Sequence, residues 1–245
     1  MNRRSIFLSL ASIGAAFIGG FLLANAFNRN ELTSLRSENE RLASMSNSAS
    51  ASESSLTAGE IRDKIAEADQ NPVDFQFQKG LGLSLYRYGA MKKDPDILAE
   101  SARLLQRAAD LNKNDRDVLV GLGNAYFDVG YFKKDNASLE RSRKWYHAAL
   151  EQRPDDVEVI TDLGLTYFLQ DPPEDANAVI EFKRTLAIDP THEKTLQFLV
   201  QALLRQNDVS AAETFIAQLN RANPNNESLA ELNTQLEESR KEPRK

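Results

Sequence analysis

Side chains that commonly carry out catalysis are scarce in this chain. The 245 residues include no cysteine and two histidines, His147 and His192. Nucleophilic catalysis needs a hydroxyl or thiol beside an oriented base, yet the sequence has neither a Gly-x-Ser-x-Gly nor a His-Glu-x-x-His motif. A phosphate-binding glycine loop and an aspartate-rich calcium loop are also absent from the sequence. The sequence therefore predicts no enzyme, no metal site and no cofactor.

The two histidines have simpler interpretations than catalysis. His147 lies in a stretch with helical spacing, and His192 follows Pro190 in a predicted turn. We interpret both as structural or solvated side chains. Acidic pairs such as Asp155-Asp156 are interpreted as solvated helix ends.

Charge and composition narrow the classes of partner. The net charge of −6 is spread over many positions and forms no concentrated basic patch of the kind that neutralises nucleic-acid phosphates. We therefore expect no nucleic acid partner. With 27% charged residues the chain is not a polytopic membrane protein, and its length allows one folded body with extensions.

One N-terminal transmembrane helix is predicted to precede the folded body. Residues 6–27 carry no charge and would span about 33 Å as a helix, which is enough to cross a bilayer. Arg3 and Arg4 precede this segment, and positive charge favours the cytoplasmic side. We therefore expect a single-pass protein of the bacterial inner membrane with a periplasmic C-terminal domain and residues 1–28 as its anchor. In the alternative, the segment is a signal, and the protein is secreted to the periplasm after cleavage at Ala26.

The segment after the predicted anchor has two parts. Residues 29–57 are predicted to form a short juxtamembrane helix and a serine-rich linker. Four residues fall on the a and d positions of two heptads and leave a homodimer open: Leu32, Leu35, Asn39 and Leu42. Two heptads are too short to hold a dimer alone.

An internal repeat organises the chain from about residue 71 onward. A shift of 41 residues aligns the Leu-Gly pair at 81–82 with those at 122–123 and 163–164. Apolar residues recur at helical spacing between these marks, and no strict alternation competes with them. Each unit is therefore predicted to contain two helices.

Capping residues mark the ends of these predicted helices. Asp94 precedes Pro95, an arrangement typical of an N-cap followed by proline at the first helical position. Asp135 is predicted to cap the equivalent helix of the second unit, and the Asp-Pro-Pro run at 171–173 that of the third. Second helices are expected to end just before three prolines, Pro154, Pro190 and Pro224.

These marks resemble the tetratricopeptide repeat (TPR), a pair of helices of about 34 residues. The second unit carries the pattern at Leu122, Gly123, Tyr126, Tyr146, Ala149, Leu150 and Pro154. The third unit carries it at Leu163, Gly164, Tyr167, Ala178, Phe182, Leu186 and Pro190. Units one and four depart from it, because Lys113 replaces the terminal proline of unit one and Val200 replaces the glycine of unit four.

Unit length is a further departure from the family. Units one and two contain about seven extra residues, which we interpret as a longer second helix with its turn, and a Sel1-like repeat is a minor alternative. The resemblance implies an all-α fold, a TPR-like α-solenoid of about four helix pairs with capping helices. The helical domain is predicted over residues 58–239, including an incoming helix near 58–69 and a capping helix near 227–239. A disordered basic tail is expected at residues 240–245.

The resemblance also implies where a protein or peptide partner would bind. In peptide-binding solenoids of this kind the first helices line a concave groove. Positions carried over unit by unit give the candidate groove: Lys79, Tyr86, Arg87, Asn124, Phe127, Asp128, Thr161, Leu165, Phe168, Gln201 and Arg205. Its aromatic members would bury against a partner while polar groups fix the register. The alternative is that these rings only pack between neighbouring repeats.

An anchor, a spacer and a groove in series predict a non-enzymatic protein–protein interaction scaffold on the outer face of a bacterial inner membrane. Tethering raises the local concentration of whatever the groove binds. The scaffold would recruit proteins for envelope assembly, and the chain resembles the TPR accessory factors of cytochrome c maturation. Alternatives are a structural subunit of a stable membrane complex and a periplasmic chaperone near the secretion channel.

Overall fold

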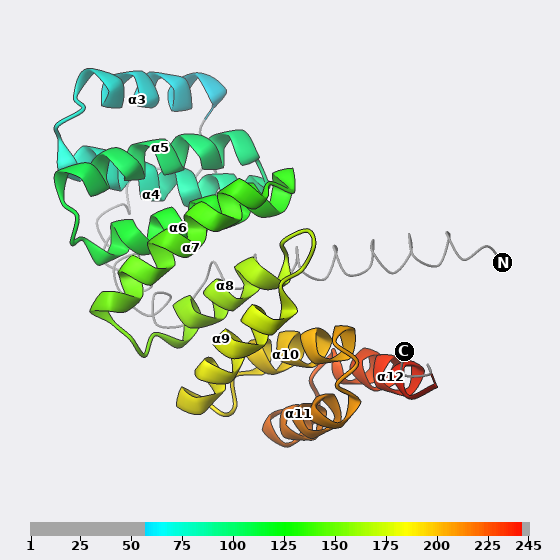
Figure 1. The fold of residues 1–245 in the computed structure, drawn as a ribbon. Helices are drawn as coiled ribbons and strands as arrows, with labels where there is room; N and C mark the ends of the chain where they lie inside the picture. The colour runs from blue at the N-terminus through cyan, green and yellow to red at the C-terminus, as the bar shows by residue number, and fades with distance from the viewer. Residues whose placement is uncertain (1–56, 242–245) are drawn as a thin grey trace, which may run out of the picture.

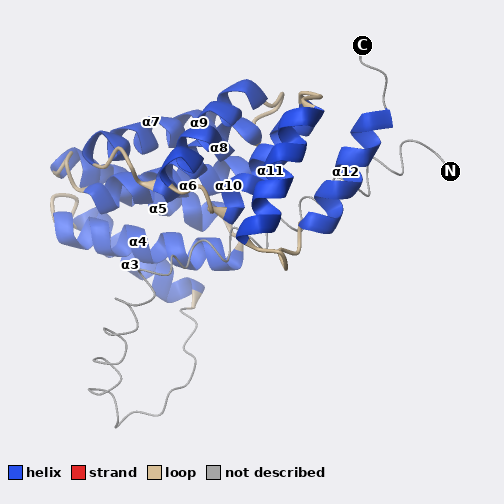
Figure 2. Cartoon of the chain, turned by 90° about the horizontal axis from the view of Figure 1, so that it is seen from below, coloured by secondary structure: helices blue, strands red, loops and turns tan. Residues whose placement is uncertain are grey.

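The computed structural model describes residues 57–241, which form ten α-helices and, within that range, no strand (Figures 1 and 2). The predictions made for the anchor, for most of the linker and for residues 242–245 lie outside the described residues. Within residues 57–241, no helix has both the length and the apolar character needed to cross a membrane.

Eight of the helices form four successive pairs. These are α4 (Phe75–Lys92) with α5 (Pro95–Leu111), α6 (Arg116–Lys133) with α7 (Asn136–Gln152), α8 (Val157–Phe168) with α9 (Asp175–Ile188), and α10 (Glu193–Arg205) with α11 (Val209–Ala222). The helix α3 (Ala58–Gln70) precedes them and α12 (Leu229–Lys241) follows them. Each second helix packs against the first helix of the next pair (Figure 1). The prediction of an all-helical, TPR-like solenoid is therefore confirmed.

The first helices of the pairs also contact one another along the stack. The helix α4 packs against α6, and α8 packs against α10, which in turn packs against α12. We call the side formed by α4, α6, α8 and α10 the first-helix face. Packing between α6 and α8 is weaker than in the flanking steps.

The signature glycines explain how closely the two helices of a pair approach. A Cβ atom on Gly123 would lie 2.4 Å from the ring of Tyr146, and one on Gly164 would lie 2.6 Å from the ring of Phe182. The buried hydroxyl of Ser142 donates to the carbonyl of Gly123 at 2.8 Å. Glycine is therefore required where the second helix places its aromatic ring against the first.

The predicted caps are confirmed in units one and two and wrong in unit three. The side chains of Asp94 and Asp135 accept hydrogen bonds from the first backbone N–H groups of α5 and α7. Helix α9, however, has Glu174 as its N-cap residue and no side-chain cap. Asp171 cannot serve because its N–H donates to Oδ1 of Asn136 at 3.1 Å and its carbonyl accepts from the same amide at 2.7 Å. These two bonds hold Asp171 against α7 and away from the start of α9.

The extra length of units one and two lies mainly in their first helices, which corrects the predicted longer second helix. Helices α4 and α6 have 18 residues each, against 12 in α8 and 13 in α10, whereas the second helices differ only as 17 against 14. The long first helices end at Lys93 and Lys134 in the left-handed conformation, with φ of 54° and 53°. Helix α8 ends earlier because Pro172 and Pro173 follow it and cannot continue a helix.

The C-terminal helix also differs from the sequence prediction. Helix α12 reaches Lys241 and so includes the first part of the predicted disordered tail. The guanidinium of Arg240 lies 2.7 Å from the carboxylate of Glu213 on α11. This ion pair joins the end of α12 to the solenoid.

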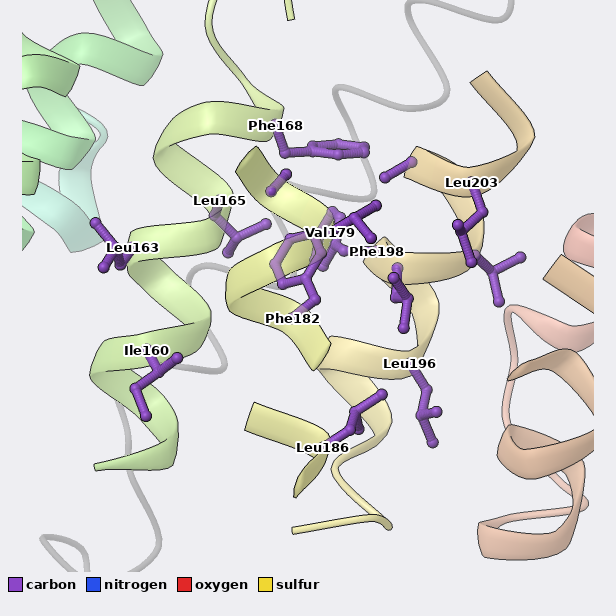
Figure 3. Close-up of a cluster of buried hydrophobic side chains, with 14 of the residues drawn as sticks. Ile160, Leu163, Leu165, Phe168, Val179, Phe182, Leu186, Leu196, Phe198 and Leu203 are labelled. Carbon is purple, nitrogen blue, oxygen red and sulfur yellow. The ribbon is translucent and has the colours of Figure 1, made fainter. Parts of the chain in front are cut away.

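Aromatic side chains join units three and four in the largest hydrophobic cluster of residues 57–241 (Figure 3). The ring centroids of Phe168 and Phe198 are 5.2 Å apart, in an edge-on arrangement. Phe182 lies 6.4 Å from each of them. The three rings come from α8, α10 and α9, so that this group of rings packs three helices together.

Candidate partner-binding site

The predicted groove residues all lie on the first helices α4, α6, α8 and α10, but they occupy different environments. The buried members are Phe127, Asp128, Thr161, Leu165 and Phe168. The partly exposed members are Lys79, Tyr86, Asn124 and Gln201. The exposed members are Arg87 and Arg205.

The apolar members belong to the hydrophobic cluster. Phe127 is 3% exposed and Phe168 is 4% exposed. The ring of Phe168 packs against Phe198 on one side, and the guanidinium of Arg205 lies 3.7 Å from its centroid. Leu165 points into the same cluster (Figure 3). These contacts give the rings a role in packing, and a role in contacting a ligand stays a prediction.

Two of the polar members are engaged inside the protein. The hydroxyl of Thr161 donates to the carbonyl of Val157 at 2.7 Å and lies 2.8 Å from the hydroxyl of Thr195. The amide oxygen of Asn124 accepts from the Tyr146 hydroxyl at 2.9 Å. Both residues therefore fix neighbouring helices to one another.

The cationic members near the ends of the first helices are paired. The ammonium of Lys79 donates to Asp115 at 2.9 Å and to Asp117 at 2.8 Å, which joins α4 to α6. Burial lowers the pKa of Lys79, but these two hydrogen bonds outweigh burial and raise its pKa above the usual value. Arg205 donates to the carbonyl of Phe168 at 3.1 Å and forms an ion pair with Asp175.

A second set of ionisable groups spans α8 and α10. The ammonium of Lys194 donates to Oδ1 of Asp162 at 2.6 Å. Nε2 of His192 lies 3.2 Å from a carboxylate oxygen of Glu158, and its Nδ1 lies 2.7 Å from the hydroxyl of Thr195. The contact with His192 is the main cause that lowers the pKa of Glu158. His192 is therefore an interhelical contact, in agreement with its structural interpretation.

Asp128 of α6 interacts electrostatically with two members of this set, Asp162 and Lys194. Its residue is 6% exposed. Burial raises the pKa of Asp128 to about 7, the charge of Asp162 adds to the rise, and Lys194 opposes it. We call Asp128, Asp162 and Lys194 the ionic cluster. It holds two carboxylates and one ammonium, contributed by three successive first helices.

The charges of the ionic cluster act on two tyrosine side chains. Burial raises the pKa of the Tyr131 phenol, and the charge of Asp128 adds to the rise. Burial also raises the pKa of Tyr146, with further contributions from Asp162, Tyr86 and Asp128. The charge of Asp128 therefore acts on tyrosine side chains of α6 and α7.

The sequence prediction omitted Asp162 and Tyr131 from the groove. A signal for Asp162 was present, because it lies in the repeat register 41 residues after Gly121. A Cβ atom on Gly121 would lie 2.8 Å from Leu83, so α6 approaches α4 closely at that point. The equivalent position of α8 carries a carboxylate side chain, and α6 and α8 pack more weakly than α4 and α6.

A cavity of about 390 Å³ lies on the second-helix side, against α5, α6 and α7. Its lining includes Tyr126, Arg103, Arg107 and Arg141. Arg103 and Arg107 lie 2.7 and 2.5 Å from the carboxylate of Asp69. Arg103 also lies 2.8 Å from the carboxylate of Glu100, so two carboxylates pair with Arg103 and Arg107. Within residues 57–241, no group of His, Asp or Glu side chains is arranged to hold a metal ion.

The helix pairs, their signature glycines and the continuous first-helix face define a helical-repeat solenoid protein. The family model described as the second ARM domain of tetratricopeptide repeat protein 21 matches residues 85–226. The chain therefore belongs to this family. No curated protein matches it by sequence.

Solved structures with the same fold include several of MamA. One MamA crystal structure is 16% identical, with a TM-score of 0.54 over 67% of this chain and 86% of that one. MamA AMB-1 is 22% identical, with a TM-score of 0.51 over 67% and 85% of the two chains. A mutant of MamA is 24% identical, with a TM-score of 0.51 over 67% and 80%. Identities this low show a shared fold alone.

Proposed function

We propose that the chain is a non-enzymatic protein–protein interaction scaffold that binds a polypeptide on its first-helix face. The ionic cluster is the observation that carries this proposal. Burying ionisable side chains costs free energy, and a stack selected only for stability would place apolar side chains there. Polar groups on a continuous helical surface are suited to fixing the register of a bound segment.

The repeat architecture supports the same function. Stacked helix pairs contact only their neighbours and together present an extended surface, to which each pair contributes equivalent positions. Asp128 occupies in unit two the position that Arg87 occupies in unit one, so the ionisable side chains of the first-helix face differ from one pair to the next. Such a surface distinguishes partners by their charge pattern.

Photo-crosslinking tests this proposal directly. A benzophenone amino acid placed at Gln201 of α10 would report contacts of the first-helix face, and one at Lys183 of α9 serves as the matched control on a second helix. We expect the Gln201 probe in the full chain to crosslink partner protein in cells and the Lys183 probe to give none. Equal crosslinking from both positions would contradict binding on the first-helix face.

The proposal also includes a cellular location for the chain and the process in which it takes part. We place the chain on the outer face of a bacterial inner membrane, where it would recruit proteins for envelope assembly, including cytochrome c maturation. The support is the uncharged segment at residues 6–27 preceded by Arg3 and Arg4. Protease added to spheroplasts should digest the helical domain of the full chain, and digestion only after lysis would contradict this orientation. A mature N-terminus at Phe27 would show cleavage instead of anchoring.

The crosslinked material also separates recruitment from a structural role. Several different proteins captured at Gln201 indicate a recruiting scaffold or a chaperone. A single protein in constant ratio to the chain indicates a structural subunit of a stable complex.

A further inference from the structure

We infer that the cavity between α5, α6 and α7 is a binding site for an organic carboxylate, that is, a carboxylate group carried on an apolar body, with the guanidinium of Arg141 as its charged partner. The carboxylate comes from a free acid or from an acidic side chain of a polypeptide. This inference goes beyond the proposed function and does not depend on it, because the cavity lies on the second-helix side of the solenoid.

Small side chains of the second helices leave room for the cavity. Helices α5 and α7 both pack against α6. Towards the cavity they present Ala99 and Ala102 from α5 and Ser138 from α7, and these side chains are too short to fill the space between the helices. Ala99 and Arg141 are exposed, so the cavity of about 390 Å³ is open to solvent.

The next unit shows how the chain itself can cover the equivalent space. Arg143 of α7 stands in the repeat register 41 residues after Ala102 of α5. Its guanidinium lies 4.6 Å from the ring centroid of Tyr167. Tyr126 occupies the position equivalent to Tyr167 and lines the cavity. Because Ala102 replaces the arginine, the ring of Tyr126 is left accessible from the α5 side.

The charges that line the cavity favour an anion. Arg103 and Arg107 of α5 and Arg141 of α7 contribute three guanidinium groups. The carboxylates of Asp69 and Glu100 form ion pairs with Arg103 and Arg107. The three cations of the lining therefore outnumber the two carboxylates in these pairs, and one further carboxylate would balance them.

Arg141 is the member of the lining that is best placed to bind the anion. Its guanidinium lies 5.7 Å from the ring centroid of Tyr126. A guanidinium beside an aromatic ring keeps its N–H donors in its own plane, where a carboxylate can accept two of them. The nearby carboxylate of Asp135 is engaged elsewhere, because it accepts hydrogen bonds from the backbone N–H groups of Ala137 and Ser138 at the start of α7.

The size and lining of the cavity define the body of the ligand. A water molecule takes up about 30 Å³ of liquid, so about 390 Å³ holds roughly a dozen non-hydrogen atoms. Ala102, Tyr126 and Val129 offer apolar contacts to these atoms. A phosphate group is not favoured, because it carries close to two negative charges and has no apolar body. A carboxylate on a short apolar or aromatic chain fits both the charge and the volume.

Titration of the full chain with matched small molecules tests the inference. The probes are hydrocinnamate, its uncharged amide hydrocinnamamide, and acetate, which lacks the apolar body. Trp145 is the single tryptophan of the sequence and packs against the same hydrophobic cluster as Tyr126, so its fluorescence reports binding. At pH 7.5 hydrocinnamate should bind about ten-fold more tightly than the amide, because hydrogen bonds between charged groups are stronger than neutral ones. Acetate should bind at least about ten-fold more weakly than hydrocinnamate, because it buries little apolar surface.

Variants assign the preference for the acid to Arg141. In Arg141→Gln, hydrocinnamate and its amide should bind within about three-fold of each other, because the side chain has lost its charge. Arg141→Lys keeps the charge and should keep part of the preference. Lys183→Gln removes the same charge from an exposed position of α9 and should keep all of it. Melting temperatures are recorded for the three variants, so that affinities are compared between folded proteins.

A peptide arm identifies the source of the carboxylate. The probes are two hexapeptides with both ends capped, Ser-Gly-Phe-Glu-Gly-Ser and its Gln counterpart, which differ only in the charge beside the aromatic residue. A Glu peptide that binds about ten-fold more tightly than hydrocinnamate would support the site and assign it to a polypeptide. Tighter binding of hydrocinnamate would support the site and assign it to a free acid.

The contradicting outcomes are distinct from those of the proposed function. Equal binding of hydrocinnamate and its amide, or a preference that survives Arg141→Gln, would overturn the carboxylate site. Acetate or inorganic phosphate that displaces hydrocinnamate at equal concentration would overturn the apolar body as part of the ligand. A full chain that binds neither hydrocinnamate nor the Glu peptide would overturn the whole inference. None of these results changes the crosslinking expected from Gln201 on the first-helix face.

Discussion

The ammonium of Lys194 and the carboxylate of Asp162 form an ion pair of 2.6 Å that joins α10 to α8, with side chains only 5% and 14% exposed. A pair that is so far removed from water is strongly coupled, because each charge has lost most of its hydration. The charge of Lys194 also acts on the buried carboxyl of Asp128, where it opposes the rise in pKa.

Loss of the cation alone should therefore be costly. We expect Lys194→Met to lower the free energy of unfolding by about 3–5 kcal/mol, the range for breaking a buried ion pair. Urea denaturation at pH 7.5 followed by circular dichroism measures this change. The double variant Lys194→Met, Asp162→Asn removes both charges and should recover most of the loss. A single variant within about 0.5 kcal/mol of the parent would show that the pair is not coupled in solution.

The raised pKa of Asp128 predicts a pH dependence of stability. Its pKa is 3.8 in the reference state and about 7 in the folded protein, so the folded state holds an extra proton between these values. Stability from this group is therefore fully present below about pH 4 and is lost as the pH rises to about 7. Asp128→Asn should be more stable than the parent by roughly 2–4 kcal/mol at pH 8. The free energies of unfolding of the two proteins should converge towards pH 4.5. A constant difference between pH 4.5 and pH 8 would contradict the raised pKa of Asp128.

The repeat register is the part of the fold that the sequence predicts best. The Leu-Gly pairs and the prolines after the second helices are local marks, and each acts within its own helix pair. The ionic cluster could not be predicted in this way, because Asp128, Asp162 and Lys194 lie on three helices and interact only after these helices pack. Asp162 did carry a signal, as a charged residue in the register position of Gly121, but its meaning depends on the spacing between α6 and α8.

The signature glycines provide a test of helix packing with a control inside the same fold. A methyl group on Gly123 would lie 2.4 Å from the ring of Tyr146, whereas nothing lies within 4 Å of a methyl group on Gly80. Gly123→Ala should therefore lower the free energy of unfolding by about 1–3 kcal/mol through overpacking. Gly80→Ala, in the interior of α4, should raise it by about 0.5–1 kcal/mol through helix propensity. Chemical denaturation compares the two, and equal effects would contradict the close approach at Gly123.

The start of α9 shows why loops are harder to predict than helices. The Asp-Pro-Pro run at residues 171–173 satisfies the local rule for an N-cap, and the rule fails because Asn136 of α7 binds the backbone of Asp171. A contact between residues 35 positions apart in sequence overrides the local preference. The same reasoning applies to the predicted aromatic strip, in which helical spacing places the rings on one face but does not decide whether a neighbouring helix covers them.

Substitution of Phe168 distinguishes packing from ligand contact. Its ring is 4% exposed and contacts Phe182 and Phe198, so Phe168→Ala should lower the free energy of unfolding by about 3–5 kcal/mol. Ile180 on α9 is 62% exposed, and Ile180→Ala should change the free energy of unfolding by less than about 0.5 kcal/mol. Thermal unfolding of the full chain measures both. A Phe168→Ala protein that keeps its stability but loses Gln201 crosslinking would instead assign the ring to the partner, because a side chain that contributes to the core cannot be removed without creating a cavity.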